Sequence, residues 1–222
     1  MIWKVRRVVT AHDQQGRSVI ASDGIAPNLK EMAGMPGLGI TDLWETGAAP
    51  ASNEGTADAV VRPVHLEPPK NGTLLRIVEF PPDSAWRGKT DGGAGFDSIG
   101  AAHAQDKHSD DPMMHKTASV DYIIVLKGEI VAIVDTGEVL LKPGDVFIQR
   151  GTRHSWSVRG NEPCIIAVVL VSATPYGAKR KAAAPAKKAV KKSVDRKAPQ
   201  KATKKTAKKA ARPAKRKTTK RR

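Results

Sequence analysis

The segment from Met114 to Ala173 consists of short apolar runs that are interrupted by turn residues about every ten positions. Runs rich in β-branched residues and bounded by Gly, Pro, Asn or Asp are typical of strands. We predict strands at 120–126, 130–134, 139–141, 146–149, 154–158 and 164–171. No amphipathic helix pattern separates them, so the segment is predicted to be all-β, with antiparallel strands in a sandwich or barrel.

The first 72 residues show a weaker pattern. Strands are predicted at 3–10 and 17–21, on either side of a hairpin turn at 12–16, with a short strand at 42–46. Residues 34–56 are rich in Gly, Ala and Pro. Such a segment extends a barrel or exchanges edge strands with a second subunit, which covers exposed edges, and we therefore predict a homodimer.

These patterns divide the chain into three parts. Residues 1–72 are predicted to form N-terminal strands and an irregular extension, residues 73–177 a β-barrel that opens with a strand at 73–80, and residues 178–222 a tail. The segment 88–111 is predicted to be a loop too long for a simple connection, and we expect it to cover a pocket as a lid.

Chemistry-bearing residues lie at the start of the barrel strands. Because side chains alternate along a strand, His115, Thr117, Ser119 and Asp121 are expected to share one face. A second histidine, His154, follows the turn at 150–153. His103 and His108 lie in a polar loop, where they would either complete a metal site or remain solvated.

Two motifs carry a family resemblance. The row His115-Lys116-Thr117, Asp121 and Gly128 forms the first, and Gly144-Asp145 followed by Gly151 and His154 forms the second. Together they resemble the cupin superfamily, whose first motif is His-x-His, Glu and Gly, and whose second ends in Pro-x-Gly and His. The combination of Met-His-Lys-Thr at 114–117, Val-Asp-Tyr at 120–122 and Gln-Arg-Gly-Thr-Arg-His-Ser-Trp at 149–156 is also similar to a subgroup of single-domain bacterial and fungal cupins. Here Thr117 stands for the second His, Asp121 for Glu, and Gln149 for Pro.

The resemblance implies a fold and a site. The fold is a cupin-type antiparallel β-barrel, or jelly roll. His115, Asp121 and His154 would hold a divalent metal, Fe, Mn, Ni or Zn, in the set of two imidazoles and one carboxylate that non-haem iron oxygenases use. Thr117, Gln149 and Trp156 would line a pocket for a small organic molecule, although a buried Trp also serves as plain core.

Two functions remain open at this point. The first is a metal-dependent oxygenase, isomerase or lyase. The second is a metal-free module that binds or senses a small molecule and is tethered to DNA by the tail. The retained spacing of His115 and His154 favours the first function, whereas Thr117 in place of the second His favours the second.

The tail has a composition unlike the rest of the chain. Residues 178–222 hold 21 Lys and Arg and one acid, Asp195, a net charge of +20, and because the chain carries +16 the remainder carries −4. Its apolar residues are nearly all Ala, so the segment is predicted to be disordered when free. Its Pro-Ala-Lys pattern resembles the tails of linker histones.

We expect the tail to bind DNA or another polyanion without sequence specificity, because cations that meet phosphates release counterions. The alternative is a solubilising tail. The basic residues expected to contact nucleic acid are Lys187, Lys188, Lys201, Lys204, Lys205, Lys215, Arg216 and Lys217.

The cysteine content and the lengths of the apolar runs bear on the cellular location of the protein. The single cysteine, Cys164, excludes an intrachain disulfide framework, which fits an intracellular protein. No apolar run is long enough to span a membrane, and the tail lacks the large apolar residues that membrane insertion requires. We therefore expect a cytoplasmic protein that associates with the nucleoid through its tail.

Overall fold

The computed structural model describes residues 2–90 and 92–178 of the chain, and Met1–Lys179 forms one compact unit. The basic tail and its eight residues predicted to contact nucleic acid lie outside the described residues. No helix in the described part of the chain is long and apolar enough to cross a membrane.

A six-stranded antiparallel sheet forms one wall of the unit. Its order is β3 (Asn28–Glu31), β4 (Gly39–Thr46), β5 (Thr73–Phe80), β11 (Cys164–Ser172), β6 (Ser119–Lys127) and β9 (Val146–Gln149). β11 lies between β5 and β6 and is the most apolar strand of the sheet, which suits its central position.

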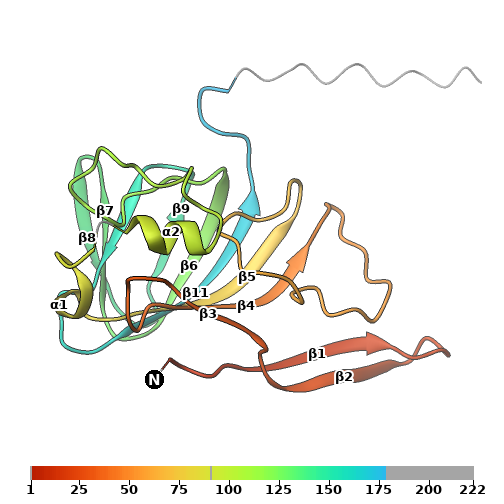
Figure 1. Ribbon diagram of the computed structural model, residues 1–222. Coiled ribbons are helices and arrows are strands. Elements are labelled where there is room, and N and C mark those ends of the chain that lie inside the picture. The colour runs from red at the N-terminus through yellow and green to blue at the C-terminus, as the bar shows by residue number, and fades with distance from the viewer. Residues whose placement is uncertain (1, 91, 179–222) are drawn as a thin grey trace, which may run out of the picture. The chain divides into compact units, whose positions relative to one another are not determined.

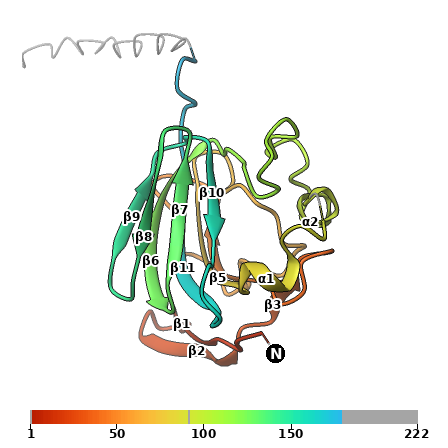
Figure 2. The ribbon, with the colours of Figure 1, turned by 90° about the vertical axis from the view of Figure 1, so that its left-hand side faces the viewer.

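A three-stranded antiparallel sheet faces it, in the order β10 (His154–Ser157), β7 (Ile130–Val134) and β8 (Gly137–Leu141). Figure 2 shows the strands of the two sheets standing side by side around a common interior. The core fills this interior, with Leu74, Ile130 and Ile166 among its least exposed residues. The all-β class and the jelly-roll barrel predicted from the sequence are confirmed.

The N-terminal hairpin lies beside the barrel (Figure 1), where β1 (Arg6–His12) pairs with β2 (Ser18–Ile25) in a sheet of its own. Every residue of β2 is exposed. The Arg7 guanidinium joins the hairpin to the unit, because it donates to the Leu43 carbonyl at 3.0 Å and pairs with Asp58. The hairpin was predicted, but its strands begin and end later than expected.

The segment 88–111 is not the plain loop that the sequence predicted. It contains α2 (Gly93–Ser98), and a shorter helix, α1 (Asp83–Trp86), precedes it. Glycines in the sequence Gly-Ala-Gly-Phe-Asp-Ser have low helix propensity. The buried Phe96 side chain compensates, since it packs into the core and is only 2% exposed. Tertiary packing therefore decided this helix.

Several predicted strands match the structure closely. The bounds of β5, β7 and β9 are those predicted, and β6, β8, β10 and β11 differ by a few residues at their ends. β3 was not predicted, because it is short, polar and stabilised by pairing with β4. The homodimer stays a prediction, since a single chain is described.

Candidate functional site

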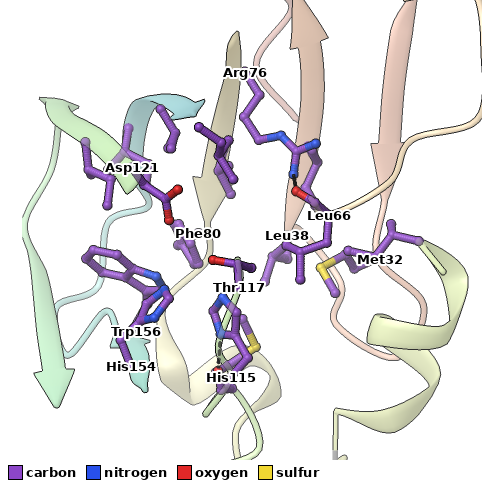
Figure 3. Close-up of a pocket in the computed structure, with 18 of the residues that line it drawn as sticks. Met32, Leu38, Leu66, Arg76, Phe80, His115, Thr117, Asp121, His154 and Trp156 are labelled. Carbon is purple, nitrogen blue, oxygen red and sulfur yellow. Dashed lines mark hydrogen bonds between the residues drawn. The ribbon is translucent and has the colours of Figure 1, made fainter. Parts of the chain in front are cut away.

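A cavity of about 80 Å³ lies inside the barrel between the two sheets (Figure 3). Most of its wall is apolar and comes from both sheets, α2 and the segments beside them. The polar residues that line it are few: Arg76, His115, Thr117, Asp121 and His154. Phe96 and Ile99, in and after α2, close one side, so part of the predicted lid segment does contact the cavity.

His115 and His154 lie side by side. The backbone N–H of each donates to the carbonyl of the other at 2.9 Å, and this isolated bridge brings the imidazole centroids to 4.2 Å. Nδ1 of His115 lies 2.7 Å from the Met113 carbonyl, and Nδ1 of His154 lies 3.0 Å from the Thr152 carbonyl. A carbonyl oxygen can only accept, so Nδ1 carries the proton in both rings and Nε2 keeps its lone pair.

Burial keeps both imidazoles neutral. It lowers the pKa of His154 well below the usual value, and the neighbouring His115 lowers it further. Burial also lowers the pKa of His115, against the opposing effects of the Met113 carbonyl and the Asp111 charge. At neutral pH the site therefore offers two unprotonated Nε2 atoms, which are basic nitrogens suited to accept a proton or to bind a metal ion.

Asp121 contributes the carboxylate of the site. It lies on β6, is 4% exposed, and its Oδ1 finds no hydrogen-bond donor among the described residues. Burial raises the pKa of Asp121 to about 6, while the Ser119 hydroxyl and the Arg76 charge act in the opposite direction. The Ser119 hydroxyl also donates to Thr117 Oγ1 at 2.8 Å. Asp121 therefore titrates closer to neutrality than an ordinary aspartate.

A buried ion cluster lies beyond the other end of the cavity. Arg76 of β5 is 2% exposed, its Nη2 lies 2.9 Å from Asp42 Oδ1, and its Nη1 donates to the Leu66 carbonyl at 3.3 Å. Arg62 shares Asp42, through Oδ2 at 2.8 Å, and also pairs with Glu45. Burial lowers the pKa of Arg76, although Asp42 counteracts it.

The sequence analysis missed Arg76. One signal was available: Arg76 is the single cation in the otherwise apolar run Leu74 to Val78, at a position that alternation places on the same face as Leu74 and Val78. A charged residue on the inward face of a buried strand requires a partner, and that partner, Asp42, is supplied by β4.

Of the three residues predicted to line the pocket beside the metal ligands, two line the cavity and one does not. Thr117 and Trp156 line the cavity, and the Trp156 ring meets the His154 ring edge-on with centroids 5.8 Å apart. Gln149 does not line it. The amide of Gln149 donates to the Thr152 carbonyl at 2.8 Å, because β9 ends at this residue and its side chain holds the following turn.

The two loop histidines take no part in the cavity wall. His103 is exposed and its Nε2 lies 3.1 Å from Glu67 Oε2, while His108 is exposed in the same loop. The alternative that they remain at the surface is the one the structure shows.

The fit of this site to a metal ion is partial. Two imidazoles with Nδ1 anchored to carbonyls and Nε2 unprotonated are oriented as metal-ligating histidines are. However, no group of three or more His, Cys, Asp or Glu residues in the described ranges is placed to hold one ion together. The arrangement as it stands provides two nitrogen ligands without a third protein ligand, and we derive no chemical step through a metal.

Cys164 offers no further chemistry here. It is buried on β11, and burial raises the pKa of its thiol to about 12. A thiol that is protonated at every physiological pH is a poor nucleophile.

Comparison with known proteins agrees with the fold. Residues 103–171 match the family model of the cupin domain. The chain is 27% identical over 163 residues to the cupin-domain-containing oxidoreductase fogC of Aspergillus ruber, a match covering 71% of this chain and 66% of that protein. It is 31% identical over 162 residues to the phomopsin biosynthesis cluster protein C' of Diaporthe leptostromiformis, covering 70% and 71%.

Among solved structures, a putative ethanolamine utilization protein Q of Salmonella typhimurium superposes with a TM-score of 0.39 and 13% identity, covering 78% of this chain and 99% of that one. This structural match is too distant to bear on function. The match to the Diaporthe protein is longer than the stretch 103–171 that the cupin family model covers, and its identity of 31% extends over 70% of this chain and 71% of that protein. The chain therefore belongs to the cupin superfamily.

Proposed function

We propose that the barrel binds a small organic molecule in its central cavity and acts on it with His115, His154 and Asp121. One observation carries this proposal: a mainly apolar cavity holds two neutral imidazoles side by side. Apolar pockets with a few convergent polar groups are where proteins bind small ligands, and titratable groups with shifted pKa values are common at reactive positions.

The chemistry of these groups suits proton transfer. Each unprotonated Nε2 would accept a proton from a ligand, and the Nδ1–H bonded to Met113 or Thr152 would fix the ring while it does so. Asp121, with its pKa of about 6, would take or return a proton near neutral pH. The apolar wall would exclude water from the reacting atoms.

A divalent ion, Fe, Mn, Ni or Zn, is part of the proposal as a bound cofactor. His115 and His154 would each supply Nε2, and the carboxylate of Asp121 would have to approach them to complete a set of three. Such an ion would supply Lewis acidity or access to redox chemistry. The Aspergillus relative is named an oxidoreductase, which favours an oxygenase among the reaction classes that the sequence leaves open.

A metal-free binding or sensing module is the second candidate. The observation in its favour is that the described residues place no third metal ligand beside the histidine pair. Elemental analysis of the full chain, purified without an affinity tag, separates the two. Near-stoichiometric Fe, Mn, Ni or Zn that His103→Ala retains and His154→Ala loses supports the metal enzyme. Protein that stays metal-free after reconstitution contradicts it.

We also propose that the tail carries the barrel to DNA or another polyanion. The support comes from charge, since residues 178–222 carry +20 and the remainder −4. Lacking aromatic residues after Tyr176, the tail would bind through phosphates and not through base stacking. Retention on DNA that falls steeply with salt is the expected behaviour.

A further inference from the structure

Two buried polar atoms that belong to the wall of the cavity have no hydrogen-bond partner among the described residues. One is Nε of Arg76, a donor, and the other is Oδ1 of Asp121, an acceptor. Both residues are more than nine-tenths buried. Burying a polar atom without a partner lowers stability, so a site that keeps two such atoms around one cavity has a structural reason to be completed by a ligand.

The hydrogen-bonding capacity of Arg76 is only partly used by the protein. Asp42 is shared with Arg62, whose other partner, Glu45, also lies 3.1 Å from His65 Nε2. The two Nη atoms of Arg76 are directed at Asp42 and at backbone carbonyls of His65 and Leu66. The remaining donor of the fork, Nε, is therefore the one able to bind an added acceptor.

The second unpartnered atom, Oδ1 of Asp121, is an acceptor and therefore needs a hydrogen-bond donor from the ligand. A hydroxyl group is the simplest small-molecule donor that leaves the cavity otherwise apolar. The surrounding wall contains Val78, Phe80 and Val168, which suit a hydrocarbon skeleton. Figure 3 shows Arg76 and Asp121 projecting from different strands of the six-stranded sheet.

We infer that the cavity binds a short aliphatic hydroxy acid, whose carboxylate accepts a hydrogen bond from Arg76 and whose hydroxyl donates to Asp121. This inference rests on the proposed function, because it specifies the ligand of the same cavity. The volume sets the size: a cavity of about 150 Å³ holds benzene, whereas this one measures about 80 Å³, so a chain of a few carbons fits better than a ring.

The inference makes Arg76 a residue that determines specificity. The Nε donor of a guanidinium has no counterpart in a lysine side chain. Arg76→Lys keeps the positive charge and removes Nε, together with the Nη contacts to Asp42 and Leu66, so a comparison of ligands on the unaltered chain tests the contact independently. Asp121→Asn keeps the shape and replaces one oxygen by a donor, so it isolates the contact with the hydroxyl.

The test is isothermal titration calorimetry on the full chain with 2-, 3- and 4-hydroxybutanoate, butanoate and 1-butanol, at fixed salt. At least one hydroxybutanoate is expected to bind about tenfold more tightly than 1-butanol, since a charge-assisted contact adds roughly 1.4 kcal/mol or more. Arg76→Lys is expected to remove that advantage and leave 1-butanol binding unchanged. Asp121→Asn is expected to bring the hydroxybutanoate down to the level of butanoate.

The outcomes are distinguishable. If 1-butanol binds as tightly as the acids and Arg76→Lys changes neither, the inference is overturned while the proposed function stands. If no probe binds, the inference is overturned, and the proposed function is then judged by its own test, the metal content of the full chain and of His154→Ala. Should Arg76→Lys fail to fold, the unaltered chain decides: the methyl ester of the best hydroxybutanoate is expected to lose about tenfold in affinity, and equal binding of ester and acid contradicts the inference.

Discussion

The two polar ends of the cavity are built in opposite ways. At one end, His115 and His154 are neutral, held by backbone carbonyls and by the backbone bridge between them. At the other, Arg76 is an ion paired with Asp42, which it shares with Arg62 in a buried cluster. The imidazoles therefore depend on main-chain geometry, whereas Arg76 depends on the charge of the Asp42 side chain.

Because of this difference, substitutions at the two ends should affect different properties, ligand binding at the histidine end and folding stability at the arginine end. Removing one imidazole leaves no buried charge behind, so it should affect ligand or metal binding more than folding. Removing one member of the ion cluster leaves an unpaired charge inside the protein, which costs far more than the pair itself contributes. Asp121 shares features of both ends, because it is ionisable like Arg76 but forms no ion pair, and its Oδ1 has no hydrogen-bond partner among the described residues.

The largest effect is expected from Asp42→Ala, which leaves Arg76 and Arg62 without their shared carboxylate. The free energy of unfolding should fall by about 3–5 kcal/mol, as measured by urea denaturation. Glu138→Ala is the matched control, since it breaks an exposed pair with Arg159 and should change stability little. Equal losses in the two variants would contradict the buried cluster as described.

Asp121→Asn should stabilise the protein above neutral pH. The pKa of Asp121 rises from 3.8 in the unfolded chain to about 6 in the folded one, so the folded state binds more protons between these values and loses stability as pH rises through them. The charged form therefore costs on the order of 3 kcal/mol at pH 8. Urea denaturation at pH 8 and at pH 3 measures this cost. Asp121→Asn should raise the free energy of unfolding at pH 8 and have no such effect at pH 3.

A gain of similar size at both pH values would show that the burial of charge is not the cause. Ser155→Ala serves as a control for this measurement, because it alters another buried side chain with an unpartnered oxygen but no ionisable group.

If the proposed metal is bound, His154→Ala should lower the metal content of the purified full chain by about tenfold or more, and His115→Ala should do the same, since each removes one of the two proposed Nε2 ligands. Both variants should unfold cooperatively, because the ring makes its one direct hydrogen bond to a carbonyl of the adjacent segment. Elemental analysis is the measurement, and His103→Ala is the surface control. Unchanged metal in His154→Ala would remove this residue from the site.

The smallest effect on the fold is expected from deleting Ala178 to Arg222. The free energy of unfolding of the remaining unit should not change, whereas salt-sensitive retention on a DNA column should be lost. Retention of the shortened chain equal to that of the full chain would show that the tail is not the nucleic-acid-binding segment. This deletion sharpens the comparison, because both polar ends of the cavity remain intact.

Local sequence patterns predicted the strands of the barrel well. β5, β7 and β9 follow from apolar runs bounded by Gly, Pro and Asp, because these elements are stabilised by residues within and directly beside them. The alternation that makes His115, Thr117 and Asp121 buried is also local, although only Asp121 lies within β6 and the other two precede it. His154 was identified by its place in the second motif, after Gly144-Asp145 and Gly151, which is again a local signal.

Other features needed contacts between distant residues. α2 contradicts its own helix propensity and depends on Phe96 in the core. Gln149 was expected at the pocket, but it bonds to Thr152 because β9 ends there. Arg76 acquires its role only when β4 brings Asp42 beside it.

The sequence by itself determined the all-β class, the alternation that buries the site residues, the membership of the cupin superfamily and the separation of a basic tail by composition. The tertiary structure decided which polar atoms meet inside the barrel: the bridge between His115 and His154, the cluster around Arg76 and the unpartnered oxygen of Asp121. The physical reason is the distance along the chain between the residues that interact. Strand patterns reflect neighbours a few residues apart, whereas a site depends on side chains brought together by sheet pairing across the chain.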